Sequence, residues 1–151
     1  MQNLYDLLHN VPLMSAFIAW FAAQFFKFII DILRYRQFNF NKFFSSGGMP
    51  SSHSAFVCAL TTGIAIQDGI SSSAFAISCV LSMIVMYDAT GVRRETGKQA
   101  TILNNLVDDL MEEKPDYFQK ELKELVGHTP LQVFSGAFIG IIIPFIINMY
   151  L

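Results

Sequence analysis

Residues 47–60, GGMPSSHSAFVCAL, place a histidine at the start of an apolar run, directly after two glycines, a proline and two serines. A helix N-terminus has free backbone N–H groups, and flexible glycines and hydroxyls beside it favour anion binding. His53 can donate a proton at neutral pH. Ser51 or Ser52 can instead cap a helix that begins near Ser54. The stretch therefore has two interpretations, an anion site and a simple helix cap.

Two basic side chains lie on one face of an earlier apolar run. Lys27 and Arg34 in KFIIDILR are seven residues apart, which is two helical turns, and Asp31 lies between them within ion-pairing reach of both. Basic side chains near the end of a membrane span also reach toward headgroups and water. The spacing therefore predicts either two cationic ligands of an anion or two anchors at the membrane surface.

Further cations and a second histidine follow later in the chain. YDATGVRRETGKQA ends an apolar run with Arg93 and Arg94, whose planar forks suit phosphate oxygens but also set topology in membrane proteins. GHTPLQVFSGAFIGI opens the last run with His128, and Gln132 lies one helical turn further along the same face. His9 has no comparable neighbours, and we assign it a structural role.

Together these groups supply the parts of a phosphoryl-transfer site. Cations and helix amides hold phosphate oxygens, one imidazole attacks, and another protonates the leaving group, so that no metal or other cofactor is needed. A metal site made of His53, His128 and Asp88 is a weaker alternative, because the spacings match no familiar ligand signature. We therefore expect a phosphate site without a metal ion.

The composition indicates that membrane-spanning helices position this site. Of the 151 residues, 53% are hydrophobic and 15% are charged, against about 45–50% and about 25% in soluble domains. Apolar runs without strand-like alternation predict helices, since backbone groups in lipid must be hydrogen-bonded internally. The net charge of −2 provides no basic surface for nucleic acid. The apolar runs are residues 12–33, 55–66, 74–87 and 130–151.

We predict a single all-α membrane domain over residues 1–151, a small polytopic bundle of about four transmembrane helices. The first and last runs are long enough to cross a hydrocarbon layer of about 30 Å, whereas the middle two are short and are expected to be tilted or enclosed by neighbours. Within residues 101–126, apolar residues recur at steps of three and four. This pattern predicts two short amphipathic helices at the membrane surface, with a solvated connector as the alternative.

The basic residues predict the orientation in the membrane. Four crossings place both termini on one side and the two polar segments, 34–50 and 88–129, on the other. Every Lys and Arg lies in those segments or at the adjacent end of the first span. The positive-inside rule then places this face in the cytoplasm. We expect an integral protein of the cytoplasmic membrane whose site faces the cytoplasm.

Three segments resemble motifs of the type 2 phosphatidic acid phosphatase superfamily, which includes vanadium haloperoxidases. KFIIDILRY is similar to K-x6-R-P, with Tyr35 in place of the proline, and PSSH is similar to P-S-G-H, with Ser52 in place of the glycine. GHTPLQVFSGAFIG resembles the end of S-R-x5-H-x3-D, where His128 matches the histidine and Gln132 occupies the position of the acid. The serine–arginine half is displaced far upstream. These departures indicate a divergent bacterial branch of the superfamily.

The resemblance implies an all-helical fold and metal-independent hydrolysis of a lipid-linked phosphate or diphosphate through a phosphohistidine. It implies His128 as the nucleophile, His53 as the acid that protonates the leaving oxygen, and Gln132 as a residue that orients the nucleophile. An amide supplies no charge, so a phosphate-lipid-binding or scaffold membrane protein with impaired catalysis is the alternative. The phosphate-binding residues that the resemblance implies are Lys27, Arg34, Ser51, Ser52, and Arg93 or Arg94.

Overall fold

The structure, a computed structural model, describes residues 2–35, 48–111 and 127–150. All regular elements within these ranges are α-helices, so the predicted all-α class is confirmed. The helices are α1 (Gln2–Leu8), α2 (Val11–Tyr35), α3 (Ser52–Asp68), α4 (Ser73–Thr90), α5 (Val92–Met111) and α6 (Pro130–Tyr150).

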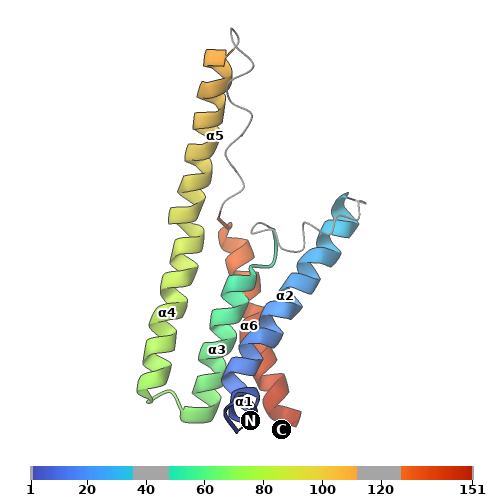
Figure 1. The fold of residues 1–151 in the computed structure, drawn as a ribbon, viewed down its shortest axis with the longest axis vertical. Coiled ribbons are helices and arrows are strands. Elements are labelled where there is room, and N and C mark those ends of the chain that lie inside the picture. Colours follow the sequence, from blue (N-terminus) through green and yellow to red (C-terminus); the bar gives the residue numbers. More distant parts are fainter. Residues whose placement is uncertain (1, 36–47, 112–126, 151) are drawn as a thin grey trace.

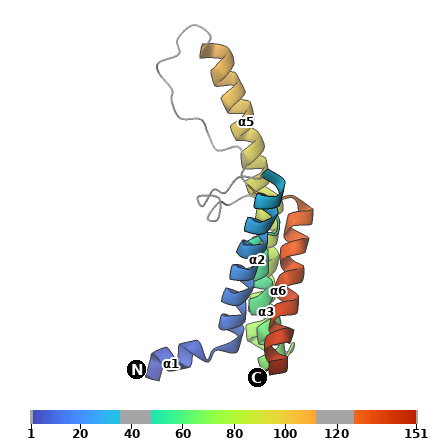
Figure 2. The ribbon, with the colours of Figure 1, turned by 90° about the vertical axis from the view of Figure 1, so that its right-hand side faces the viewer.

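Helix α3 lies at the centre of the bundle. It packs against α2, α4 and α6, and α2 also packs against α6. Figure 1 shows both termini at one end of the bundle and the starts of α3 and α6 at the other. Figure 2 shows that α1 points away from the bundle at the end with the termini, while α5 extends beyond it at the opposite end. The predicted site residues therefore belong to segments that meet at one end.

The interior of the bundle is built from small side chains, and the large apolar ones point outward. Three alanines of α2 and two of α3 form one fully buried cluster: Ala16, Ala19, Ala23, Ala55 and Ala59. Four of the five phenylalanines of α2 are about half exposed: Phe17, Phe21, Phe25 and Phe26. Small residues allow helices to approach closely in lipid, where apolar side chains gain little by turning inward. This distribution is typical of a membrane protein.

Two glycines bring α6 into backbone contact with the start of α3. A side chain at Gly136 would collide with the Ser51 carbonyl oxygen, and one at Gly140 would collide with the Ala55 carbonyl oxygen. The Ser51 N–H also donates to the Gln132 carbonyl oxygen at 2.9 Å. This G-x-x-x-G seam holds the first turn of α3 against the first turns of α6.

Within the described residues, three helical stretches are long and apolar enough to cross a membrane by length and composition: Val11–Leu33, Ser73–Val107 and Pro130–Tyr150. The sequence predicts about four spans, and α3 accounts for the difference. It has 17 residues, about 25 Å of helix, and it carries polar side chains that are buried against its neighbours. As expected for a short middle run, α3 is enclosed by the other helices.

The predicted pair of short amphipathic helices is not observed as such. Residues 101–111 form the second half of α5, which continues the direction of α4 in Figure 1. The reason is that backbone hydrogen bonds continue through Gly91, whose N–H donates to Tyr87 O at 2.8 Å and whose carbonyl accepts from Glu95 N at 3.0 Å. The second predicted helix falls in residues outside the described ranges.

Candidate active site

Ser51 caps the first turn of α3 through hydrogen bonds with Ser54. Ser51 is the N-cap, and its Oγ accepts from the Ser54 N–H at 3.4 Å and from the Ser54 hydroxyl at 3.0 Å. Both serines are fully buried, and Ser52 is nearly so. The capping interpretation of Ser51 is therefore confirmed. The N–H groups of Ser52 and His53 belong to the first turn, which has no intrahelical acceptors for them.

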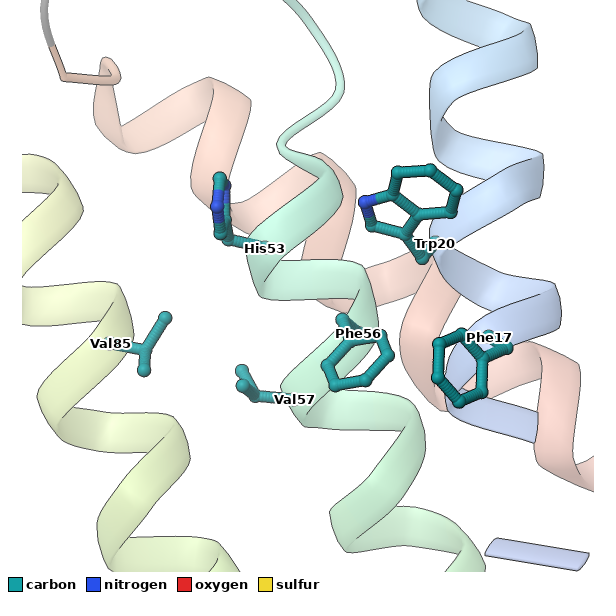
Figure 3. Close-up of a pocket in the computed structure, with 6 residues that line it drawn as sticks. All are labelled: Phe17, Trp20, His53, Phe56, Val57 and Val85. Carbon is teal, nitrogen blue, oxygen red and sulfur yellow. The ribbon is translucent and has the colours of Figure 1, made fainter. Parts of the chain in front are cut away.

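His53 is the exposed member of this turn. It shares one face of α3 with Phe56 and Val57, which follow it by three and four residues. Figure 3 shows its imidazole above these two side chains, at one end of a cavity between α2, α3 and α4. The cavity has a volume of about 320 Å³ and is lined by Phe17, Trp20, His53, Phe56, Val57 and Val85.

His128 lies in the turn before α6, with only 7% of its surface exposed. Its backbone N–H donates to the Ala89 carbonyl oxygen, near the end of α4, at 2.9 Å. The preceding Gly127 has a φ of +89°, and a side chain there would collide with the backbone of Arg93 and Arg94. Only glycine satisfies both conditions. This close approach places His128 beside the junction of α4 and α5.

A capping box at the start of α6 fixes the side chain of Gln132. Thr129 Oγ1 accepts from the Gln132 N–H at 3.4 Å, and Gln132 Oε1 accepts from the Thr129 N–H at 3.0 Å. His128 Nδ1 lies 3.1 Å from the same Oε1. Because a backbone N–H can only donate, the oxygen of the amide faces Thr129, and His128 Nδ1 must carry the proton. The lone pair of His128 is therefore on Nε2.

Two cations of the predicted set, Lys27 and Arg93, belong to different helices, α2 and α5. Lys27 in α2 has only 4% of its surface exposed, and its Cε packs against Gly48, where an added Cβ would lie 3.0 Å away. Arg93 at the start of α5 is exposed, and its Nε donates to Asp88 Oδ2 at 2.6 Å. One cation is thus enclosed by the bundle and the other is held at its edge.

The pKa of His53 is lowered from its ordinary value. Partial burial is the largest cause, and the positive charges of Arg93 and Lys27 act in the same direction. Asp88 opposes them. His53 is therefore within electrostatic reach of both cations, and it takes up a proton at a lower pH than an unperturbed histidine.

The pKa of His128 is also lowered, again chiefly by burial. The hydrogen bond with Gln132 opposes this shift. His53, Lys27 and Arg93 each reinforce it, in that order. The two imidazoles and two of the cations therefore converge at one end of the bundle, and His128 is neutral at pH 7.

The other predicted phosphate ligands are placed differently. Arg34 lies in the last turn of α2, and its side chain falls outside the described part of the chain. Arg94 is exposed, and it is Arg93 of this pair whose charge acts on both histidines. Ser51 and Ser52 lie in the first turn of α3 with buried side chains.

Some features of the site were missed by sequence reasoning. The ion pair of Asp88 and Arg93 spans five residues, which is not a helix-face spacing, so the sequence carried no signal for it. The reciprocal bonds of Thr129 and Gln132 follow a T-x-x-Q signature that was present in the sequence. Gln24, one turn before Lys27, is a buried amide whose Oε1 meets no hydrogen-bond donor among the described residues.

Among the residues that the structure describes, no three His, Cys, Asp or Glu side chains gather in a way that could hold a metal ion. The weaker interpretation of His53, His128 and Asp88 as metal ligands therefore gains no support within those residues.

Comparison with known proteins gives two matches. The sequence model of the Divergent PAP2 family matches residues 8–143. The uncharacterized membrane protein YuiD of Bacillus subtilis (strain 168) is 44% identical over 155 residues, which cover 96% of this chain and 98% of that protein. No solved structure matches. The match covers the two histidine-bearing turns and both converging cations, as the resemblance of their motifs predicts, and the chain belongs to the Divergent PAP2 family.

Proposed function

We propose that this membrane protein hydrolyses a lipid-linked phosphate or diphosphate through a phosphohistidine on His128, without a metal ion. The proposal is supported chiefly by the convergence of two imidazoles with Lys27 and Arg93 at one end of the bundle. Membership of a family related to phosphatidic acid phosphatases agrees with this chemistry. The helices long and apolar enough to cross a membrane support a substrate that carries a lipid part.

In the first step, the Nε2 lone pair of His128 attacks phosphorus. The N–P bond forms as the bond from phosphorus to the lipid oxygen breaks, and His53 gives its proton to that oxygen. In the second step, a water molecule attacks the phosphohistidine, and the now neutral His53 accepts the proton of the water. The N–P bond breaks, inorganic phosphate leaves, and both histidines return to their starting states.

The amide of Gln132 is compatible with this role. In serine proteases, exchange of the triad acid for an amide costs about 10⁴ in turnover because the imidazole takes the wrong tautomer. Here the Thr129 N–H turns the amide oxygen toward His128, so the required tautomer is retained. Gln132 adds no negative charge, so stabilisation of the developing positive imidazole is weaker than with a carboxylate.

The phosphate oxygens are bound by cations and by backbone amides. Lys27 and Arg93 supply positive charge, and the first turn of α3 supplies the N–H groups of Ser52 and His53 at the positive end of the helix dipole. Bound phosphate competes with Asp88 for Arg93, so the observed ion pair exchanges when substrate enters. Arg34, Arg94 and Ser51 remain predicted ligands.

The test is phosphate release from dioctanoyl phosphatidic acid by purified protein in detergent with EDTA present. The wild type is expected to release phosphate, and His128→Ala is expected to lower the rate by at least about a thousandfold. His9→Ala is the matched control, because His9 directly follows α1, which lies at the opposite end of the bundle, and is stacked on Tyr5. Activity that survives His128→Ala refutes the assigned nucleophile.

A second function, binding of phosphate lipids without turnover, is favoured by two observations. Gln132 provides no charge, and Arg93 is already partly neutralised by Asp88. This function predicts saturable binding of phosphatidic acid with no phosphate release, and no gain of activity in Gln132→Asp. Any phosphate release that depends on His128 excludes it.

A further inference from the structure

The cavity below His53 has one polar end and otherwise apolar walls. Phe17 and Trp20 of α2 form one side, Phe56 and Val57 of α3 form the floor, and Val85 of α4 forms the other side. The Phe17 and Phe56 rings meet edge to face, with their centroids 5.4 Å apart, which stiffens the wall between α2 and α3.

The position of this cavity restricts what can occupy it. Its α2 and α4 walls belong to stretches that are long and apolar enough to cross a membrane, so we expect the cavity to lie within the hydrocarbon layer. Its upper end meets His53, which is within electrostatic reach of Lys27 and Arg93. An occupant that satisfies both ends is an apolar chain attached to an anion.

We infer that this cavity holds the hydrocarbon chain of a phosphate-bearing lipid whose phosphate lies at His53, and that it selects substrates by their tails. The volume of about 320 Å³ is at the lower end of ligand pockets, which fits part of a single chain better than a complete diacyl lipid. The inference rests on the proposed phosphate site and adds to it the route of the tail between α2 and α4.

Helix periodicity supports this assignment independently of charge. His53, Phe56 and Val57 project from one face of α3, so a chain that follows this face leads from the imidazole into the apolar part of the cavity. Trp20 lies beside the imidazole end in Figure 3, next to the expected path of the first carbons of the chain.

The first experiment fills the cavity and compares substrates. Val85→Phe adds a ring to the α4 wall, and we expect it to lower the ratio of kcat/KM for dioleoyl phosphatidic acid to kcat/KM for p-nitrophenyl phosphate by at least about tenfold. Val80→Phe is the matched control, because Val80 is an exposed residue of the same helix and does not line the cavity. An unchanged ratio in Val85→Phe, or an equal change in Val80→Phe, overturns the inference. If the wild type hydrolyses neither compound, the proposed enzymatic function fails instead.

The second experiment detects occupancy without activity. Trp20 is the sole tryptophan of the chain and lines this cavity, so all tryptophan fluorescence comes from this one residue. In phosphatidylcholine nanodiscs we expect phosphatidic acid with brominated chains to quench Trp20 more strongly than phosphatidylcholine with the same brominated chains at the same mole fraction. We expect Val85→Phe to remove this excess and Val80→Phe to keep it. Equal quenching by the two lipids shows only bulk lipid contact and overturns the inference, whereas excess quenching without phosphate release supports the tail site in a binding protein.

Discussion

One histidine lies at the start of α3 and another in the turn before α6, and they are held in opposite ways. His53 is exposed inside its helix, and its ring makes no hydrogen bond to the described residues. His128 is buried before its helix, and both its backbone and its ring are hydrogen-bonded. A nucleophile gains from a single held geometry, whereas an acid must exchange protons with water and follow the leaving group. The comparison indicates that the fold gives rigidity to His128, the histidine that we propose as the nucleophile.

Removal of the exposed histidine is expected to have the largest effect among the tests of this comparison. His53→Ala should lower kcat for an alkyl phosphate by about 10²–10⁴, because the poor leaving oxygen then departs without a proton. The loss should be much smaller for p-nitrophenyl phosphate, whose leaving group is acidic. Rates for both compounds, measured side by side, test this split. Equal losses would show that His53 holds the substrate and does not act as an acid.

Removal of the Gln132 oxygen that accepts from His128 Nδ1 is expected to have an intermediate effect on kcat. Gln132→Leu removes the acceptor for His128 Nδ1 and should lower kcat by about 10–100-fold. Gln132→Glu keeps an acceptor and adds a negative charge, so it should retain more activity and raise the pKa of His128. The acid limb of the pH–rate profile should then move to higher pH. Identical profiles for the two variants would contradict the tautomer assignment.

The pH–rate profile of the wild type is expected to differ moderately from that of a site whose two histidines keep their ordinary pKa values. His128 must be neutral to attack, and His53 must be protonated to act as an acid. Burial and the charges of Arg93 and Lys27 lower the pKa of His53 below its ordinary 6.5, so its protonated fraction falls already at acidic pH. The lowered pKa of His128 keeps the nucleophile neutral there. The rate should therefore be highest below pH 6.5 and fall above it, and a maximum above pH 8 would contradict these roles.

A change on another face of α3 is expected to have the smallest effect. Thr61 Oγ1 lies on the α3–α4 contact, 2.8 Å from the Ser82 hydroxyl oxygen and 3.1 Å from the Ser78 carbonyl oxygen, which can accept its proton. Thr61→Val should lower the free energy of unfolding by about 0.6 kcal/mol, and at most about 1.7 kcal/mol, because this is the range for polar contacts between membrane helices. Thermal unfolding in detergent measures the change, and phosphate release should be preserved. A loss of activity as large as that in Gln132→Leu would show that the α3–α4 contact also governs the site.

The helices and the convergence of the site could be predicted because they depend on local patterns. Apolar runs of sufficient length predict α2 and α6, and the placement of cations and histidines at the ends of those runs predicts that they meet. The capping role of Ser51 follows from its position before the run, and the structure confirms it. Each of these inferences needs only the helical repeat and the thickness of the membrane.

The features that could not be predicted depend on how the helices are rotated relative to one another and on contacts between segments far apart in the sequence. Arg93 and Arg94 are adjacent in the sequence. Which of them faces the histidines is set by the backbone contact with Gly127, and no spacing in the sequence predicts that contact. Residues 101–111 belong to a helix that begins at Val92, because backbone hydrogen bonds continue through Gly91 from α4 into α5. The cavity walls are ordinary apolar residues in apolar helices, so their role is visible only once α2, α3 and α4 are placed together.

The glycine seam between α3 and α6 has a consequence for how such proteins diversify. Gly136 and Gly140 allow α6 to contact α3 through main-chain atoms. The distance between the turn that carries His53 and the turn that carries His128 is therefore set by the backbone and not by the surrounding side chains. Residues such as Phe17 and Val85 lie outside that seam and can be exchanged while the imidazoles stay in register. The same backbone frame is thus compatible with the proposed phosphate lipids whatever the length of their tails.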